Sequence, residues 1–279
     1  MLISSNSSSK GSSAKATRPQ DAKLTLQNVA VRHQHSTVLE IDQLSLSAQQ
    51  ITVILGHNGS GKSTLMKLLA RQQAPSSGTI SLNEQALSRF SQRQLAQQLA
   101  YLPQRLPDVA GLSVTELVRL GRFPWRGTLG RWRKQDQLAV EQAMSDTNVS
   151  HYAQHLADQL SGGERQRAWI AMLLAQQAPL LLLDEPTSAL DLAHQYELMT
   201  LLGRLNQQQQ RGIIVILHDV NLACRFADRI IALKQGKICF DGSAEALLQS
   251  DTLKQVYGLN FDLITQPSQS LPVAAVAGL

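Results

Sequence analysis

The residues best suited to do chemistry lie in a glycine-rich stretch near the start of the chain. Residues 56–63 read GHNGSGKS and fit the phosphate-binding pattern G-x-x-x-x-G-K-[ST]. The stretch follows the apolar run 51–55 and precedes a helical pattern over 62–70, the context that this motif requires. Glycines let backbone amides close around phosphates, Lys62 can reach the β- and γ-phosphates, and Ser63 can bind Mg²⁺. The nucleotide-binding residues that we expect are Gly56, His57, Asn58, Gly59, Ser60, Gly61, Lys62, Ser63 and Thr64.

A second candidate anion site begins at residue 161. Ser161 can cap a helix with its hydroxyl, and Gly162 and Gly163 follow it without a Cβ. Such a turn exposes backbone N–H groups at a helix N-terminus, where hydrogen bonding and the helix dipole both favour an anion. Small residues then recur at helical spacing as far as Pro179, which predicts a tightly packed helix.

Two apolar runs carry polar side chains at their carboxyl ends. Residues 180–183 and 213–217 are typical of parallel strands buried on both faces. Asp184 and Glu185 follow the first run, and His218 follows the second. Open α/β sheets place their chemistry at this edge, so we expect these side chains to lie together, with His218 within reach of a γ-phosphate.

Length and composition limit the class of protein. The chain has 279 residues, enough for one large domain or one domain with an inserted lobe. Two cysteines, Cys224 and Cys239, define neither a disulfide framework nor a metal cluster, which favours a reducing compartment. No apolar run approaches the roughly 18 residues that a membrane span needs, and the Ser-rich N-terminus is not a secretory signal. We therefore expect a soluble chain that would need another chain to form any pore.

The remaining patterns outline the domain organisation. Residues 1–22 are predicted to be a disordered tail, and alternation from Lys23 onward predicts an antiparallel sheet. Residues 105 to about 160 are predicted to form a helical lobe, with helices over 114–120 and 137–144. A hairpin is expected over 230–240, and residues 259–279 are predicted to be a poorly specified tail. His151 and His155, at helical spacing, are expected on a wet surface.

In this order, the motifs resemble those of the ATP-binding cassette (ABC) ATPases. The resemblance rests on the loop at 56–63, the signature LSGGE at 160–164, the strand that ends at Glu185, the SALD segment at 188–191, and His218. It covers about residues 23–258, the expected ATPase domain. The runs YLPQ at 101–104, GRFPW at 121–125 and ERQRAWIA at 164–171 are similar to iron–siderophore importers of the ferric-hydroxamate type.

The resemblance implies a fold and a set of roles. The fold is an α/β P-loop NTPase core with an antiparallel β subdomain and an inserted α-helical subdomain. It implies an ATPase in which Glu185 polarises the attacking water, Gln104 and His218 assist, and Ser63, Gln104 and Asp184 surround Mg²⁺. It also implies that Ser161, Gly162, Gly163 and Asp191 act on the ATP of a second copy, so that two copies sandwich two nucleotides.

The same resemblance implies partners. These are a transmembrane permease and, indirectly, a periplasmic substrate-binding protein, at the cytoplasmic face of the inner membrane and without nucleic acid. A cobalamin or haem importer would share the motifs, because the substrate never touches this chain. A non-transport ABC ATPase would usually carry two cassettes or a long coiled coil, and neither pattern is present. His33 stands where the family has an aromatic residue that stacks on adenine, although it could equally be a solvated loop residue. His33 and His35 together are a weak candidate for a metal-binding pair.

A basic segment over residues 105–134 stands out from the shared motifs. Its seven Arg and Lys residues outnumber Asp108 and Glu116, and Phe123, Pro124 and Trp125 lie among them. One interpretation is a surface that faces the anionic membrane leaflet or acidic loops of a membrane partner, with Arg122 and Arg126 in contact. The alternatives are an ordinary solvated face and a nucleic-acid surface, but the sequence has no base-stacking or groove-reading module for the latter.

Overall fold

The computed structural model describes residues 22–34, 36–127, 130–266 and 271–278. The predicted tail at 1–22, except for Ala22, and His35 of the His-x-His pair lie outside the described residues. A six-stranded sheet forms the centre of the fold, with strand order β10-β9-β3-β8-β7-β6. Its strands are β3 (Ile51–Gly56), β6 (Leu99–Leu102), β7 (Leu180–Leu183), β8 (Gly212–Ile216), β9 (Arg229–Lys234) and β10 (Lys237–Gly242).

The central sheet is parallel from β6 to β9 and buried on both faces. Leu181 and Leu183 of β7 pack into one hydrophobic core, whereas Leu180 and Leu182 pack into the other. Successive side chains of a strand point to opposite faces, so an all-leucine strand fills both cores. Leu102 of β6 pairs with Leu183, which pairs in turn with Val215 of β8. The carboxyl ends of neighbouring strands therefore meet at one edge, as predicted.

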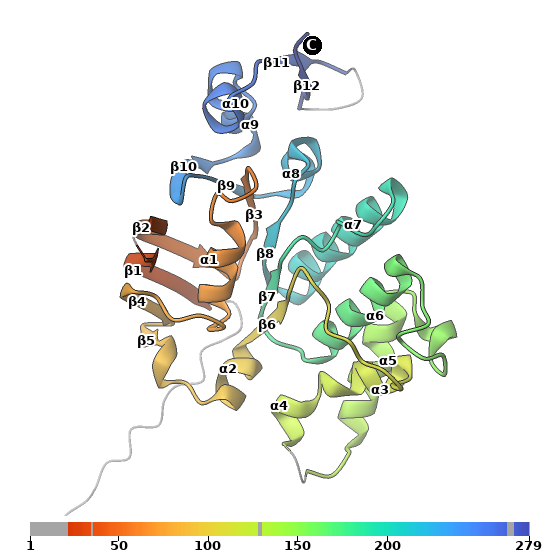
Figure 1. The fold of residues 1–279 in the computed structure, drawn as a ribbon. Coiled ribbons are helices and arrows are strands. Elements are labelled where there is room, and N and C mark those ends of the chain that lie inside the picture. Colours follow the sequence, from red (N-terminus) through yellow and green to blue (C-terminus); the bar gives the residue numbers. More distant parts are fainter. Residues whose placement is uncertain (1–21, 35, 128–129, 267–270, 279) are drawn as a thin grey trace, which may run out of the picture.

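A second, antiparallel sheet packs against the first through helix α1 (Lys62–Leu69). Its order is β2-β1-β4-β5, with β1 (Lys23–His33), β2 (Ser36–Ser47), β4 (Ser77–Leu82) and β5 (Gln85–Ala86). Leu24 and Leu26 of β1 share a core with Leu65 and Met66 of α1 and with Ile54 of β3. Figure 1 shows α1 beside both sheets. The predicted α/β fold with an antiparallel subdomain is confirmed.

The helical lobe lies on the other side of the parallel sheet (Figure 1). It contains α3 (Val114–Leu120), α4 (Phe123–Arg126), α5 (Lys134–Asp146), the 3-10 turn η3 (Ser150–Tyr152) and α6 (Gly162–Ala175). The predicted helix at 114–120 is found at those residues, and the predicted 137–144 lies within α5. Ser113 caps α3 by accepting a hydrogen bond from Glu116 N–H at 3.2 Å. Helices α2 (Gln92–Gln98), α7 (Leu192–Gln209) and α8 (Val220–Phe226) complete the core.

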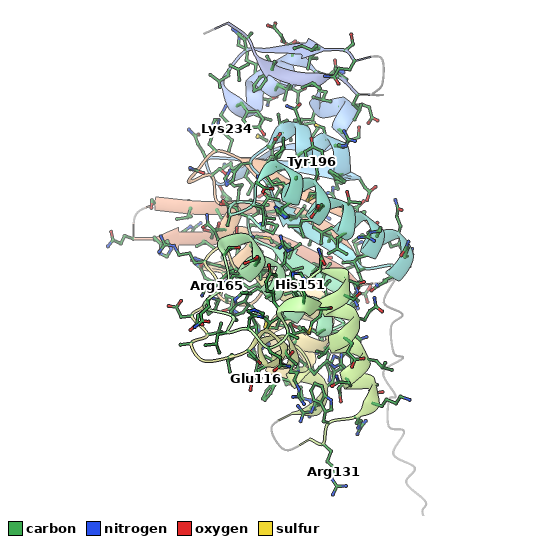
Figure 2. The ribbon with its side chains drawn as sticks, turned by 90° about the vertical axis from the view of Figure 1, so that its right-hand side faces the viewer. Glu116, Arg131, His151, Arg165, Tyr196 and Lys234 are labelled. Carbon is green, nitrogen blue, oxygen red and sulfur yellow. The ribbon has the colours of Figure 1, made fainter. Side chains whose placement is uncertain are left out.

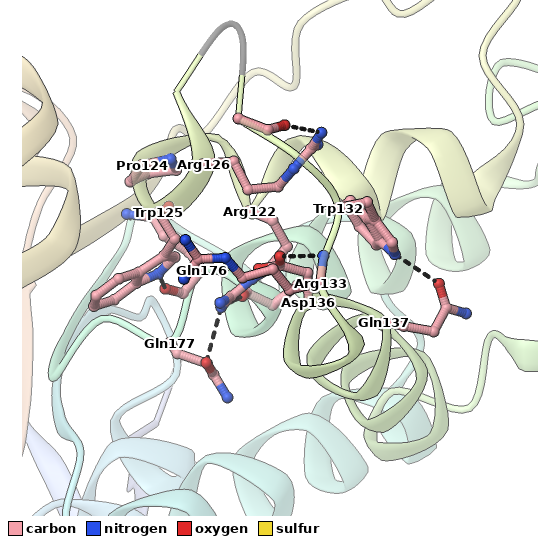
Figure 3. Close-up of polar contacts among 12 residues, drawn as sticks. Arg122, Pro124, Trp125, Arg126, Trp132, Arg133, Asp136, Gln137, Gln176 and Gln177 are labelled. Atoms are coloured by element: carbon pink, nitrogen blue, oxygen red, sulfur yellow. Dashed lines mark hydrogen bonds and ion pairs between the residues drawn. The ribbon is translucent and has the colours of Figure 1, made fainter.

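The expectation that Arg122 lies on a docking surface is wrong, because the residue is buried. Its guanidinium and the carboxylate of Asp136 are only 3% and 1% exposed, and Nε donates to Asp136 Oδ1 at 2.9 Å. Nη1 donates to the carbonyl of Ala175 and to Gln177, each at 2.8 Å (Figure 3). Pro124 is also buried. A buried charge needs a paired, hydrogen-bonded partner, and Asp136 supplies it, so Arg122 joins α4, α5 and the end of α6.

The end of the chain is more ordered than the sequence pattern predicted. After α9 (Ala244–Leu247) and α10 (Ser250–Tyr257), strands β11 (Phe261–Ile264) and β12 (Val273–Val276) form an antiparallel pair. Asn221 of α8 donates to the carbonyl of Ala274 at 3.0 Å and accepts from its N–H at 2.8 Å. This reciprocal contact holds β12 against the core. Over the described ranges, none of the helices combines the length and apolar character needed to span a bilayer.

Candidate nucleotide site

The phosphate-binding loop connects β3 to α1 and depends on backbone conformations that favour glycine. Gly56 has a φ of 143°, and a Cβ there would lie 2.3 Å from the carbonyl oxygen of Leu233. Gly61 caps α1 with a φ of 102°. Both positions have left-handed φ values, and the contact at Gly56 leaves no room for a side chain. Asn58 and Gly59 are exposed at the tip of the loop, where a ligand can reach them.

Lys62 lies inside this loop and is buried. Its ammonium donates to the carbonyls of Gly56 at 2.8 Å and His57 at 3.0 Å. Burial lowers the pKa of Lys62, and the charges of Glu185 and Asp184 partly oppose that effect. The ammonium therefore sits in a site that favours its charged form less than water does. A phosphate in the loop would supply the missing negative charge.

Ser63 and Asp184 provide oxygen ligands suited to a magnesium ion. The Ser63 hydroxyl donates to Asp184 Oδ1 at 3.2 Å. Burial raises the pKa of Asp184, the Ser63 hydrogen bond opposes this, and the neighbouring Glu185 charge raises the pKa further. A bound cation would offset both the burial of the Asp184 carboxylate and its repulsion by Glu185. Mg²⁺ is usually bound by one or two carboxylates together with substrate phosphates and water, so this sparse set of donors fits it.

Glu185 is held at both carboxylate oxygens. Gln104 Nε2 donates to Oε2 at 2.5 Å, and His218 Nε2 lies 2.7 Å from Oε1. The Glu185 side chain is 9% exposed, whereas His218 is 47% exposed. Glu185 also has a φ of 53°, an unusual backbone conformation for a residue other than glycine and one often found at functional sites. The strand ends thus bring together the three side chains that the sequence predicted to be catalytic.

The signature residues lie apart from the phosphate loop. Ser161 caps α6, and Figure 1 shows α6 and α1 in different parts of the molecule, with β6 and β7 between them. A Cβ on Gly163 would lie 3.3 Å from Leu190, so the signature turn packs against the segment that precedes Asp191. Asp191 caps α7 and accepts from the backbone N–H of His194 at 2.9 Å. His33 is exposed at the end of β1.

Two contacts of the site were not predicted. His57 Nε2 lies 2.9 Å from the carbonyl oxygen of Tyr257, which connects the phosphate loop to the end of α10. The Tyr152 hydroxyl donates to Glu164 beside the signature turn. No local pattern indicates the first contact, because 200 residues separate its partners. The second pair is closer in sequence, 12 residues apart, but no sequence pattern indicates it either.

Comparison with known proteins agrees with this geometry. The family model described as ABC transporter matches residues 39–188. The iron(3+)-hydroxamate import ATP-binding protein FhuC of Bacillus subtilis is 40% identical over 250 residues, which cover 90% of this chain and 93% of that protein. A structure described as an inward-facing conformation of a metal-chelate type ABC transporter aligns with a TM-score of 0.79 and 27% identity, over 92% of this chain and 98% of that one. A dimeric bacterial ABC transporter cassette aligns with a TM-score of 0.72 and 27% identity, over 79% of this chain and 98% of the other.

Proposed function

The chain belongs to the ABC transporter family, and we propose that it is the ATP-hydrolysing subunit that energises uptake of an iron–siderophore of the ferric-hydroxamate type through a partner permease. One observation carries the ATPase assignment. A buried lysine in a phosphate-binding loop lies at the same sheet edge as a carboxylate held by Gln104 and His218. The substrate class rests on the similarity to the iron(3+)-hydroxamate import protein.

Glu185 is the proposed general base. It accepts a proton from a water molecule whose oxygen attacks the γ-phosphorus of ATP, and ADP leaves. Each oxygen of Glu185 has one partner in the structure, and a carboxylate oxygen can accept a second hydrogen bond, so Glu185 can hold that water while both contacts remain. His218 is the more exposed partner. By turning toward the γ-phosphate, it would free Oε1 and stabilise the developing charge.

Magnesium would be held by Ser63 and Asp184, with the side-chain oxygen of Gln104 close by. When bound, the ion neutralises charge on the β- and γ-phosphates. Lys62 contacts the same phosphates from inside the loop. The amides of residues 58–64 complete the phosphate contacts, as the first turn of α1 leaves its N–H groups without partners in the helix.

We infer that the signature turn serves the nucleotide of a second copy. Ser161, Gly162 and Gly163 form an anion site that lies apart from the chain's own phosphate loop, and the aligned cassette is a dimer. Two ATP molecules would then lie between two copies, with Asp191 close to the interface. Glu185→Gln should bind ATP, hydrolyse it very slowly and form a dimer. Ser161→Arg should abolish that dimer in sedimentation, because its side chain fills the site. A dimer that persists would exclude the sandwich arrangement.

The permease would dock on the exposed part of the helical lobe, at the cytoplasmic face of the inner membrane. We call this the lobe surface: Phe123, Trp125, Arg131, Lys134 and Leu138. Phe123 is 57% exposed and Leu138 is 54% exposed, and a groove of about 620 Å³ passes between Trp125 and Leu138. Figure 2 shows Arg131 pointing away from the body of the molecule. The apolar and basic character fits a partner loop with apolar and acidic residues.

Arg122 and Arg126 were both expected in this surface. Arg122 is buried, however, and Arg126 is held by contacts within the lobe. Arg122 forms the buried floor of the groove. Arg126 donates to the carbonyl of Gly130 at 2.8 Å, and its guanidinium lies 4.7 Å from the centre of the Trp132 ring (Figure 3). Charge reversal at Arg122 would therefore test folding rather than docking.

Transport in a reconstituted complex tests the proposal. Complexes with the permease and a periplasmic binding protein should import a ferric hydroxamate with ATP, and Glu185→Gln should stop import. Phe123→Asp combined with Leu138→Asp should abolish assembly while the free subunit still binds ATP. Ile264→Asp is the matched control, as Ile264 is 51% exposed on β11 and lies outside the lobe. Import of haem or cobalamin instead of the ferric hydroxamate would overturn the substrate class and leave the ATPase assignment in place.

A further inference from the structure

The capping turn of α6 is held by a carboxylate of its own first turn. Glu164 Oε2 accepts the backbone N–H of Ser161 at 2.9 Å and its hydroxyl at 2.7 Å. Both donors of Ser161 are therefore taken by one oxygen of Glu164, which leaves the first backbone N–H groups of α6, at Gly162 and Gly163, to meet the partner's ATP. A carboxylate near a helix N-terminus is favourable in itself. Beside a site for a phosphate, however, its negative charge opposes binding unless its orientation is controlled.

Tyr152 occupies the other oxygen of this carboxylate. Its hydroxyl donates to Glu164 Oε1. The bond from Tyr152, with those from Ser161, lowers the pKa of Glu164 to about 2, so the group is ionised at any physiological pH. The pKa of Tyr152 is raised chiefly by the same bond, so the phenol keeps its proton and remains a donor.

Two histidines hold the Tyr152 ring in place. The His151 ring centre lies 4.0 Å from that of Tyr152, and the His155 ring packs edge-on at 5.4 Å. The carbonyl of Tyr152 also accepts the N–H of His155 at 2.9 Å. Both histidines are exposed, as the sequence predicted, and they flank a tyrosine that points inward to α6. Figure 2 labels His151 on the helical lobe. Nothing in the nucleotide motifs accounts for this arrangement.

We propose that Tyr152 is a positioning residue for the nucleotide site that the signature turn offers to a second copy. By holding Oε1 of Glu164, it keeps Oε2 on Ser161 and prevents the carboxylate from swinging toward the partner's γ-phosphate. Without the Tyr152 hydroxyl, Oε1 of the ionised Glu164 carboxylate has no hydrogen-bond donor to hold it, and the carboxylate can turn toward an incoming phosphate. This inference rests on the proposed sandwich dimer, and Tyr152 itself does not touch the nucleotide.

The test measures ATP-driven dimerisation in the Glu185→Gln background. Tyr152→Phe should raise the dimer dissociation constant about tenfold, because the released carboxylate repels the partner's phosphate, and this repulsion exists only in the dimer. ATP binding by the free subunit should stay unchanged, as it uses the chain's own phosphate loop. In a Glu164→Gln background, Tyr152→Phe should have no further effect, because the charge that it controls is gone.

Tyr196→Phe is the matched control, since the Tyr196 hydroxyl has no hydrogen-bond partner within the described ranges. Additive effects of Tyr152→Phe and Glu164→Gln, or a lower ATP affinity of the free Tyr152→Phe subunit, would show a general structural role and overturn the proposal. If Tyr152→Phe left the dimer dissociation constant unchanged while Ser161→Arg still abolished the dimer, the role of Tyr152 would be overturned and the sandwich would stand. A dimer that survives Ser161→Arg would instead reject the sandwich on which it rests.

Discussion

Replacing Arg122 with methionine should destabilise the protein strongly, although this residue lies in a segment that reads as a charged surface. Methionine keeps much of the side-chain volume and removes the guanidinium. The change leaves the carboxylate of Asp136, 1% exposed, without its cation, and leaves the carbonyl of Ala175 without a donor. The N–H of Arg133, which donates to Asp136 Oδ2 at 3.1 Å, remains as a weaker partner.

The size of the effect follows from this geometry. Removing one partner of a buried ion pair costs about 3–5 kcal/mol. For a domain of roughly this size, each kcal/mol lowers the melting temperature by about 2–4 °C, so Arg122→Met should lower it by about 6–20 °C. The double variant Arg122→Met with Asp136→Leu should recover most of the loss, because it removes both charges from the interior.

Thermal unfolding of the nucleotide-free subunit measures this directly. Arg131→Met is the control: Arg131 is exposed, and its replacement should change the free energy of unfolding by no more than about 0.5 kcal/mol. A fall of less than about 2 °C in Arg122→Met would refute the argument. We would also reject the argument if Arg122→Met with Asp136→Leu lost at least as much free energy of unfolding as the two single variants lose together.

Three further outcomes concern the phosphate loop and its neighbours. Mg-ATP at a hundredfold excess over Kd should stabilise the wild type by about 2.7 kcal/mol, and a melting-temperature shift should be nearly absent in Lys62→Ala. Gly56→Ala should abolish nucleotide binding in a filter or fluorescence assay, because its Cβ would lie 2.3 Å from the carbonyl of Leu233. Burial raises the pKa of Asp184, so its ionisation costs stability as the pH rises through that raised value. Asp184→Asn should therefore raise the melting temperature of the nucleotide-free protein at neutral pH, and the gain should shrink as the pH approaches the ordinary value of 3.8.

The parts of the fold that sequence could predict are those specified by local patterns. The run at 180–183 is wholly apolar and forms β7 at those residues, because a strand covered on both faces has no polar side to interrupt the run. The helix at 114–120 begins at a capping serine and carries a helical apolar pattern. Strand ends of a parallel sheet share an edge, which is why Glu185 and His218 could be expected together.

The parts that sequence could not predict depend on distant partners. Arg122 looks exposed among other arginines, and its burial depends on Asp136 and on the carbonyl of Ala175, 53 residues away. The strand pair at the end of the chain has no alternating polar pattern in β12, and it is held by Asn221 instead. The fixed position of Glu164 depends on Tyr152, whose hydroxyl has no sequence signature.

Phosphate release from a single turnover, measured in the assembled complex, tests whether Glu185 is the general base of this ATPase. Replacing it with glutamine keeps its shape and removes its basicity. Glu185→Gln should retain bound ATP and release phosphate about 10²–10⁴-fold more slowly than the wild type. Phosphate release near the wild-type rate, with ATP bound equally well, would contradict the role of Glu185 as general base.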